Sequence, residues 1–131
     1  MSIPVVTKSV AWIASAIAAL PIKLYTKTDS GYHEVYDDYR LPLLNDYSGN
    51  GMIANDLKRQ VLTDLLLDGN GYAYISKKGN KITKLSYIPT TRLTYTESVN
   101  TIDKIINIWV DGKPVQDYNV FRLVNNSKNR Y

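Results

Sequence analysis

The sequence contains no cysteine and a single histidine among its 131 residues. Without cysteine there are no disulfide bonds, no thiol nucleophile and no cysteine metal site. The lone His33 lies beside Glu34 in a polar stretch, whereas most metal sites draw more ligands from firmer elements. Serine and threonine are plentiful, but one histidine permits no triad away from His33. We therefore expect a protein that is not an enzyme and that holds no metal or cofactor.

Paired carboxylates and phosphate-binding loops are scarce as well. Asp37 and Asp38 are adjacent, so in an extended chain their carboxylates point to opposite sides, which is poor geometry for acid–base catalysis. The run Gly49-Asn50-Gly51 precedes an expected helix, and a helix N-terminus can bind anions. No Gly-Lys-Ser or Gly-Lys-Thr follows, so we interpret this run as a turn.

The charge is only mildly unbalanced. The formal net charge is +4, and the basic residues are spread along the chain. Such an excess mildly favours contact with nucleic acid or acidic surfaces, but a solvated surface is the simpler interpretation. The aromatic residues are 11 Tyr, 2 Trp and 1 Phe. Because tyrosine joins an apolar ring to a polar tip, this bias indicates half-buried sheet faces or an interface.

No hydrophobic run is long enough for a transmembrane helix. The uncharged stretch between Lys8 and Lys23 is shorter than the roughly 20 residues that span a bilayer. A signal peptide is an alternative, because Lys8 precedes the stretch and Ser15-Ala16-Ile17-Ala18 offers small residues for cleavage. Two features argue against a signal peptide. Apolar residues precede Lys8, and residues 21–25 alternate like a strand. Membrane association is a third alternative, which we do not favour.

We instead predict a helix over residues 4–20. Pro4 suits the first turn of a helix, where a missing N–H costs nothing. A helix that is apolar nearly all round is buried on several sides, and another subunit can supply part of that burial. Its large residues form one stripe of Val6, Val10, Ile13, Ile17 and Leu20. Its flat face, which we expect to contact the core or another subunit, consists of Ala11, Ala14, Ser15 and Ala18.

A second helix is predicted over residues 54–67. Either Asn50 or Asn55 is expected to cap its start, and Gly69 lies where a left-handed residue closes a helix. Its expected buried stripe is Leu57, Val61, Leu62, Leu65 and Leu66.

Beyond Gly69 the hydrophobic period is two, which is typical of strands. Asp111-Gly112 is a preferred two-residue hairpin turn, 41–44 is an apolar anchor between loops, and the polar tail 125–131 is a loop that leads onward. The predicted strands are 22–27, 32–36, 72–77, 81–88, 91–96, 105–110, 113–118 and 119–124. We therefore predict a single α+β domain over residues 1–131, with two main helices packed on antiparallel hairpins or a mixed sheet.

The predicted hairpin over residues 72–88 combines aromatic and basic residues. The tyrosines are Tyr72, Tyr74 and Tyr87, and the lysines are Lys77, Lys78, Lys81 and Lys84. Aromatic rings beside lysines can stack on single-stranded nucleic acid and neutralise it. Alternatively, the tyrosines pack on the second helix while the lysines protect the turn from edge pairing. We favour this structural interpretation and keep a small nucleic-acid-binding β domain as the alternative function.

The most informative run is Leu65-Leu66-Leu67-Asp68-Gly69-Asn70-Gly71-Tyr72-Ala73-Tyr74-Ile75. It resembles the Leu-rich helix end and Gly-Asn-Ala-Tyr-Ala strand of tailed-phage portal proteins of the HK97 type. Gly71 stands where that family usually has alanine, and Arg122 where it often has histidine. Other similar segments follow the same order: Ala18-Ala19-Leu20-Pro21-Ile22-Lys23-Leu24-Tyr25, Leu41-Pro42-Leu43-Leu44, Lys84-Leu85-Ser86-Tyr87-Ile88-Pro89 and Asn119-Val120-Phe121-Arg122-Leu123.

The resemblance implies a structural role without catalysis. The chain would be the N-terminal wing portion of a longer portal subunit, with the stem and clip still ahead of it. The full protein would form a dodecameric ring at one vertex of the capsid in the virion, after assembly in the host cytoplasm. Double-stranded DNA would pass through the ring, driven by terminase docked on the clip.

The same resemblance assigns roles to residues of this chain. Wing surfaces would face neighbouring subunits, the major capsid protein and scaffold, which gives the small-residue face a role. The helix-to-strand motif would comprise Gly69, Asn70, Tyr72 and Tyr74.

Overall fold

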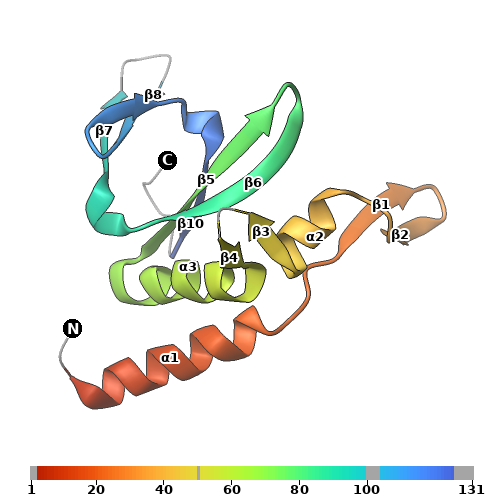
Figure 1. The fold of residues 1–131 in the computed structure, drawn as a ribbon, viewed down its shortest axis with the longest axis horizontal. Coiled ribbons are helices and arrows are strands. Elements are labelled where there is room, and N and C mark those ends of the chain that lie inside the picture. The colour runs from red at the N-terminus through yellow and green to blue at the C-terminus, as the bar shows by residue number, and fades with distance from the viewer. Residues whose placement is uncertain (1–2, 50, 100–103, 126–131) are drawn as a thin grey trace.

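The structure, a computed structural model, describes residues 3–49, 51–99 and 104–125. Helices α1 (Pro4–Ala18) and α3 (Ala54–Asp68) lie against each other beneath two small sheets (Figure 1). A hairpin and the short helix α2 (Arg40–Asn45) project to one side. The fold is α+β, as predicted. Within the described residues no helix is both long and apolar enough to cross a membrane.

The strands pair only with antiparallel neighbours in the described part of the chain. Two sheets have three strands each, in the orders β10-β5-β6 and β7-β8-β9, and two further pairs are β1-β2 and β3-β4. Short 3-10 helices, η1 (Thr90–Arg92) and η2 (Asp117–Asn119), precede β7 and β10. The strands are β1 (Leu24–Thr28), β2 (Gly31–Val35), β3 (Tyr47–Gly49), β4 (Met52–Ile53), β5 (Asn70–Lys78), β6 (Lys81–Ile88), β7 (Leu93–Val99), β8 (Lys104–Val110), β9 (Lys113–Val115) and β10 (Val120–Val124).

Strand β5 separates two hydrophobic clusters, because successive side chains of a strand point to opposite faces. Tyr72 faces the second sheet, where it is buried with Ile88, Leu93 and Ile108. The neighbouring Ala73 faces α3. In that second cluster Ala73 is buried with Leu57 and Val61, and Leu85, Tyr87 and Leu123 pack around them. Full burial of each large side chain contributes about 1.5–3 kcal/mol.

Two predictions that rest on glycine, the end of the second helix and the turn at Asp111-Gly112, are confirmed. Gly69 has φ 78° and its N–H donates to the carbonyl of Leu65 at 3.0 Å, so it closes α3 in the left-handed conformation. Asp111 and Gly112 have φ 54° and 77°, as the two-residue turn between β8 and β9 requires.

Four predictions about local structure were wrong. Residues 41–44 are not an anchor between loops but belong to α2, whose Leu43 carbonyl accepts a hydrogen bond from Ser48 Oγ at 2.9 Å. The predicted strand 113–118 ends at Val115, where η2 follows. The predicted strand 91–96 starts only at Leu93 because η1 precedes it. Asn55 does not cap α3, because the N-cap residue is Ile53. The Asn55 side chain bonds to the end of α1 instead.

Two other predictions lie outside the described residues. These are the alternative cap at Asn50 and the tail over 126–131.

Candidate functional site

The small face of α1 is used within the chain. Ala14 and Ala18 are 0% and 1% exposed where α1 packs on α3. Ala11 and Ser15 lie at the edge of this contact and line a shallow groove with Gln60 of α3. Small side chains let two helices approach closely, so the run of small residues in the sequence correctly indicated a close helix contact. The burial of Ala14 and Ala18 against α3 agrees with the expected core contact, and contact of this face with another subunit stays a prediction.

Polar groups of α3 hold the C-terminal end of α1. The Asn55 amide donates to the Ala18 carbonyl at 3.2 Å, and Lys58 Nζ donates to the Leu20 carbonyl at 3.1 Å. The last carbonyls of a helix lack intrahelical partners, and the Asn55 amide satisfies that of Ala18. The Lys58 ammonium group holds the chain just beyond the helix. Sequence analysis missed these two residues, since nothing in the local pattern links them to a helix nearly 40 positions earlier.

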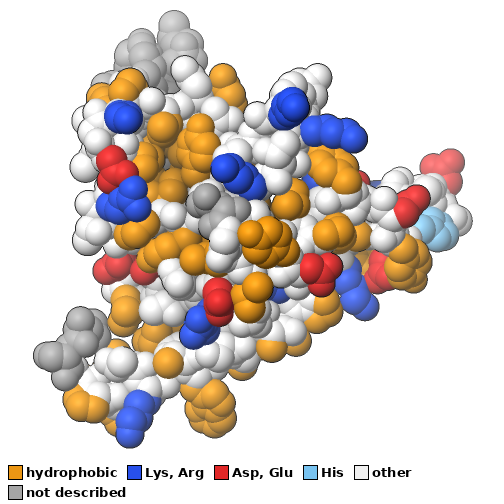
Figure 2. All heavy atoms as spheres, in the orientation of Figure 1, with side chains coloured by type: hydrophobic (Ala, Val, Ile, Leu, Met, Phe, Trp, Pro, Cys, Tyr) orange, Lys and Arg blue, Asp and Glu red, His pale blue; other side chains and the backbone are white. Residues whose placement is uncertain are grey.

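Most large apolar residues in and after α1 are exposed in this chain, and of the predicted stripe only Val6 and Val10 are half-buried. Burial of the rest of the stripe by another subunit stays a prediction. Trp12 is 80% and Val5 70% exposed, and Ile13, Ile17 and Leu20 are 45–62% exposed. Figure 2 shows hydrophobic side chains protruding along the outer edge of this helix, at the bottom of the view. Exposed apolar surface of this extent marks interaction sites in soluble proteins.

An apolar groove opens beside α1, at the end of the helix that leads towards α2. It has a volume of about 480 Å³. Its wall is apolar apart from Arg40 and Lys58. The side chains that reach it from four parts of the fold include Ile17, Leu20, Leu43, Leu44, Ile75 and Phe121. Helix α3 thus covers one part of the β10-β5-β6 face and leaves the rest open.

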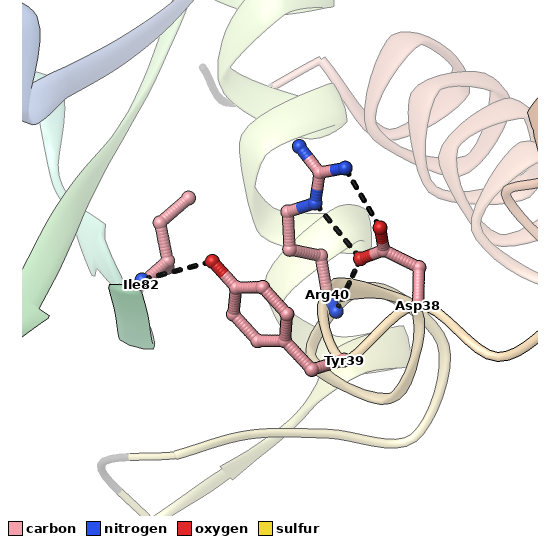
Figure 3. Close-up of polar contacts among 4 residues, drawn as sticks. All are labelled: Asp38, Tyr39, Arg40 and Ile82. Atoms are coloured by element: carbon pink, nitrogen blue, oxygen red, sulfur yellow. Dashed lines mark hydrogen bonds and ion pairs between the residues drawn. The ribbon is translucent and has the colours of Figure 1, made fainter. Parts of the chain in front are cut away.

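The start of α2 is fixed by three consecutive residues (Figure 3). Asp38 accepts three hydrogen bonds from Arg40, from its backbone N–H at 2.9 Å and from Nε and Nη2 at 2.8 Å each. These bonds, with the guanidinium contributing most, lower the pKa of Asp38 to about 2. Tyr39 reaches the other way, and its hydroxyl accepts the Ile82 N–H of β6 at 3.3 Å. The triplet therefore ties α2 to the sheet at the rim of the groove.

The β1-β2 hairpin carries a tyrosine face that sequence analysis did not single out. The register sets Tyr25 opposite Glu34 and Lys27 opposite Tyr32. Lys27 Nζ lies 5.8 Å from the centre of the Tyr32 ring. Tyr36 also reaches Glu34, and that hydrogen bond raises the pKa of its phenol. These contacts are visible only once the strand register is known.

His33 is on the opposite face of this hairpin. Its Nε2 lies 2.9 Å from Ser30 Oγ. Among the described residues there is no cluster of three or more metal-ligating side chains.

The residues of the helix-to-strand motif hold α3, β5 and β10 together. The N–H of Asn125 donates to the Gly69 carbonyl at 3.0 Å, which holds the end of β10 beside the turn. Asn70 pairs with Val124, and Tyr72 with Arg122. Tyr72 and Tyr74 both contribute to the cluster between the two sheets. Gly71, which sequence analysis noted only as a departure, faces Val61 of α3 so closely that no Cβ fits.

The 72–88 hairpin does not form the stacking platform of the alternative function. Tyr87 points away from Tyr72 and Tyr74, and its hydroxyl donates to Asp64 of α3 at 2.5 Å. With Tyr72 buried between the sheets, no row of exposed rings remains on these strands.

The four lysines of this hairpin are exposed. Lys77 Nζ lies 5.1 Å from the Tyr118 ring centre, and Lys81 Nζ lies 5.3 Å from that of Tyr39. Lys78 is at the hairpin turn, and the Cβ of Lys84 lies against Gly49. Two of the lysines thus have aromatic partners within the chain. Of the tyrosines, only Tyr87 packs on α3 as the structural interpretation expected, whereas Tyr72 and Tyr74 pack between the two sheets.

Comparison with known proteins identifies the family. The sequence profile described as "Phage portal protein" matches residues 4–128, nearly the whole chain. The chain belongs to the phage portal protein family. The predicted resemblance is thereby confirmed. No curated protein matches the sequence.

A solved portal structure shows the same fold. It is the crystal structure of an HK97 family phage portal protein from Corynebacterium diphtheriae, with a TM-score of 0.62 and 15% sequence identity. The match covers 95% of this chain and 38% of that portal protein. This chain therefore has the fold of a portal segment, and it spans about two-fifths of the length of the portal protein that it matches.

Proposed function

We propose that this chain is a structural part of a portal subunit and that its surfaces join neighbouring copies in a ring at a capsid vertex. The observation that carries the proposal is the family match over residues 4–128. The exposed apolar surfaces of α1 and the groove support it, because a subunit of a ring needs two different contact surfaces. On this proposal the chain is the wing portion, and residues 1–131 form one domain.

The wider role follows from the family. The ring is a dodecamer at the portal vertex of the virion, assembled in the host cytoplasm with the major capsid protein and scaffold. Double-stranded DNA is packaged and ejected through its channel. The chain itself performs no catalysis, and ATP hydrolysis belongs to the terminase that docks on the ring.

Electron microscopy of the purified protein tests this role. The gene product is expressed from its native reading frame, stained and classified, while native mass spectrometry counts the subunits. We expect closed rings with an axial channel, made of a single number of identical copies. A preparation that contains only monomers or two-fold dimers at every concentration contradicts the proposal.

A further inference from the structure

Helix α1 carries an outer ridge that the described part of the chain leaves exposed. The ridge consists of Val5, Ser9, Trp12 and Ala16, which share one face because residues three or four apart are neighbours on a helix. Ser9 Oγ donates to the Val5 carbonyl at 2.8 Å, so its hydroxyl is satisfied within the helix. The ridge is therefore mainly apolar, with the exposed Lys8 on its flank, and Trp12 is its largest side chain.

The apolar groove is the concave counterpart of this ridge. Its volume of about 480 Å³ lies within the range of about 300–1,000 Å³ typical of sites that enclose a ligand. Phe121, which is 47% exposed, borders the groove from the sheet, and Leu43 and Leu44 border it from α2. Apolar side chains from outside the chain would meet an apolar wall there, except at Arg40, which is paired with Asp38, and Lys58, which donates to the Leu20 carbonyl.

The ridge does not reach the groove of its own chain. The groove runs along the side of α1 that carries Ile17 and Leu20. At 3.6 residues per turn, Trp12 lies about 140° around the helix from Ile17. One chain thus displays two unlike apolar patches on different sides. A contact between unlike patches is heterologous, and repeated contacts of this kind close into a ring when the rotation allows.

We propose that the outer ridge of one copy docks in the apolar groove of the next copy, with Trp12 as its anchor. This inference rests on the proposed ring function and names the two surfaces that meet. Arg40 adds chemical complementarity, because its guanidinium lines the groove and a cation binds favourably over a tryptophan face. The ridge brings no carboxylate that would compete with Asp38 for that guanidinium. Tryptophan is one of the residue types enriched among the anchors of protein interfaces.

Mixed disulfide formation tests which surfaces meet. The chain has no native cysteine, so Ala16→Cys places a single thiol on the ridge and Phe121→Cys a single thiol at the groove. The two variants, tagged to differ in size, are mixed and mildly oxidised. We expect the mixed dimer to exceed either homodimer several-fold. Ala11→Cys, an exposed alanine on the other flank of α1, is the matched control and is expected to give no such excess with Phe121→Cys.

Equal yields for the ridge and control thiols, or no mixed dimer, overturn the proposed docking. So does a groove thiol that is shielded from alkylation without forming a mixed dimer, because another segment then occupies the groove.

Sedimentation measures the contribution of the anchor. Trp12→Ala is expected to weaken self-association at least tenfold, whereas Tyr36→Ala, at a residue that is also 80% exposed, leaves it unchanged. An unchanged association constant for Trp12→Ala, or a wild-type chain that stays monomeric at its highest soluble concentration, contradicts the docking. If microscopy shows rings but no mixed disulfide forms, the docking inference is wrong and the proposed function stands. Failure of ring formation would sink the proposed function.

Discussion

Gly71 on β5 packs directly against the backbone of Val61 on α3. A Cβ built on Gly71 overlaps the carbonyl oxygen and a methyl group of Val61. The carbonyl belongs to a helix backbone and cannot move aside as a flexible side chain could. The helix and the strand therefore approach as closely as they do only because position 71 carries no side chain.

Gly71→Ala is expected to destabilise the fold by about 1–3 kcal/mol, the usual cost of overpacking a filled core. Urea unfolding followed by circular dichroism measures the loss. Gly69→Asn is the matched control, because the space around Gly69 is open and asparagine tolerates positive φ. It should cost less than Gly71→Ala, because it meets only the left-handed backbone and no overlapping atom. Equal effects of the two substitutions would show that the Gly71 contact is not tight.

Two alanines of α1 differ only in the side of the helix on which they lie. Ala14 is buried against α3, and Ala16 is exposed on the outer ridge. Ala14→Leu should therefore cost about 1–3 kcal/mol of stability, whereas Ala16→Leu should stay within about 0.5 kcal/mol. Thermal unfolding of both variants compares them directly. If Ala14→Leu is as stable as the wild type, α1 does not pack on α3 through this face.

Local signals predicted much of the fold. The turn chemistry of Gly69 and of Asp111-Gly112, together with the change of hydrophobic period, gave the main helices and most strands. Which face of α1 is buried within the chain was harder to predict, for a physical reason. The small face was expected to contact the core or another subunit, and within the chain it is this face, through Ala14 and Ala18, that packs closely on α3, while most of the large stripe stays exposed.

The groove and the hairpin face were less predictable because they depend on contacts between distant segments. The groove combines residues from α1, α2, α3 and the sheet, so no window of sequence contains it. The face of the β1-β2 hairpin depends on the register that sets Tyr25 opposite Glu34. The Tyr/Lys pattern at 72–88 was visible in the sequence, but the burial of Tyr72 shows that proximity in sequence does not place side chains on one face.

Asn45 clamps the base of the projecting hairpin. Its amide donates to the Ile22 carbonyl at 2.9 Å, and its Oδ1 accepts the Ile22 N–H at 2.7 Å. Asn45→Ala should speed hydrogen exchange of the Ile22 amide about tenfold, which corresponds to about 1.4 kcal/mol of lost local protection. Asn55→Ala, which removes a similar bond to α1, should leave that amide unchanged. An unchanged exchange rate in Asn45→Ala would show that the clamp does not hold the hairpin.

Arg40 controls the titration of Asp38. The bonds from Arg40 hold the pKa of Asp38 at about 2, below its usual value of 3.8. Since the pKa is lower in the folded state, the stabilising contribution is present above about pH 4 and is lost as the pH falls towards 2. Arg40→Gln should move the midpoint of Asp38 upwards, as measured by NMR of the side-chain carboxyl. A midpoint that stays near 2 in this variant would mean that another group lowers the pKa.

Tyr87 links α3 to the sheet through a hydrogen bond whose stabilising effect is lost at alkaline pH. Its hydroxyl donates to Asp64, and burial, reinforced by that carboxylate, raises the pKa of the phenol above its usual value of 10.0. The folded state therefore holds the proton more tightly than the unfolded state does. The stabilisation is complete below pH 10 and is lost as the pH rises towards the folded pKa.

Tyr87→Phe is accordingly expected to flatten the fall of stability above pH 10. One group can change the slope by at most about 1.4 kcal/mol per pH unit, so urea midpoints at several alkaline pH values resolve it. Tyr32→Phe removes the hydroxyl of an exposed ring and is measured at the same pH values for comparison. Parallel curves for Tyr87→Phe and the wild type would mean that Tyr87 does not hold its proton more tightly in the folded protein. The link between α3 and β6 would then rest on apolar packing alone.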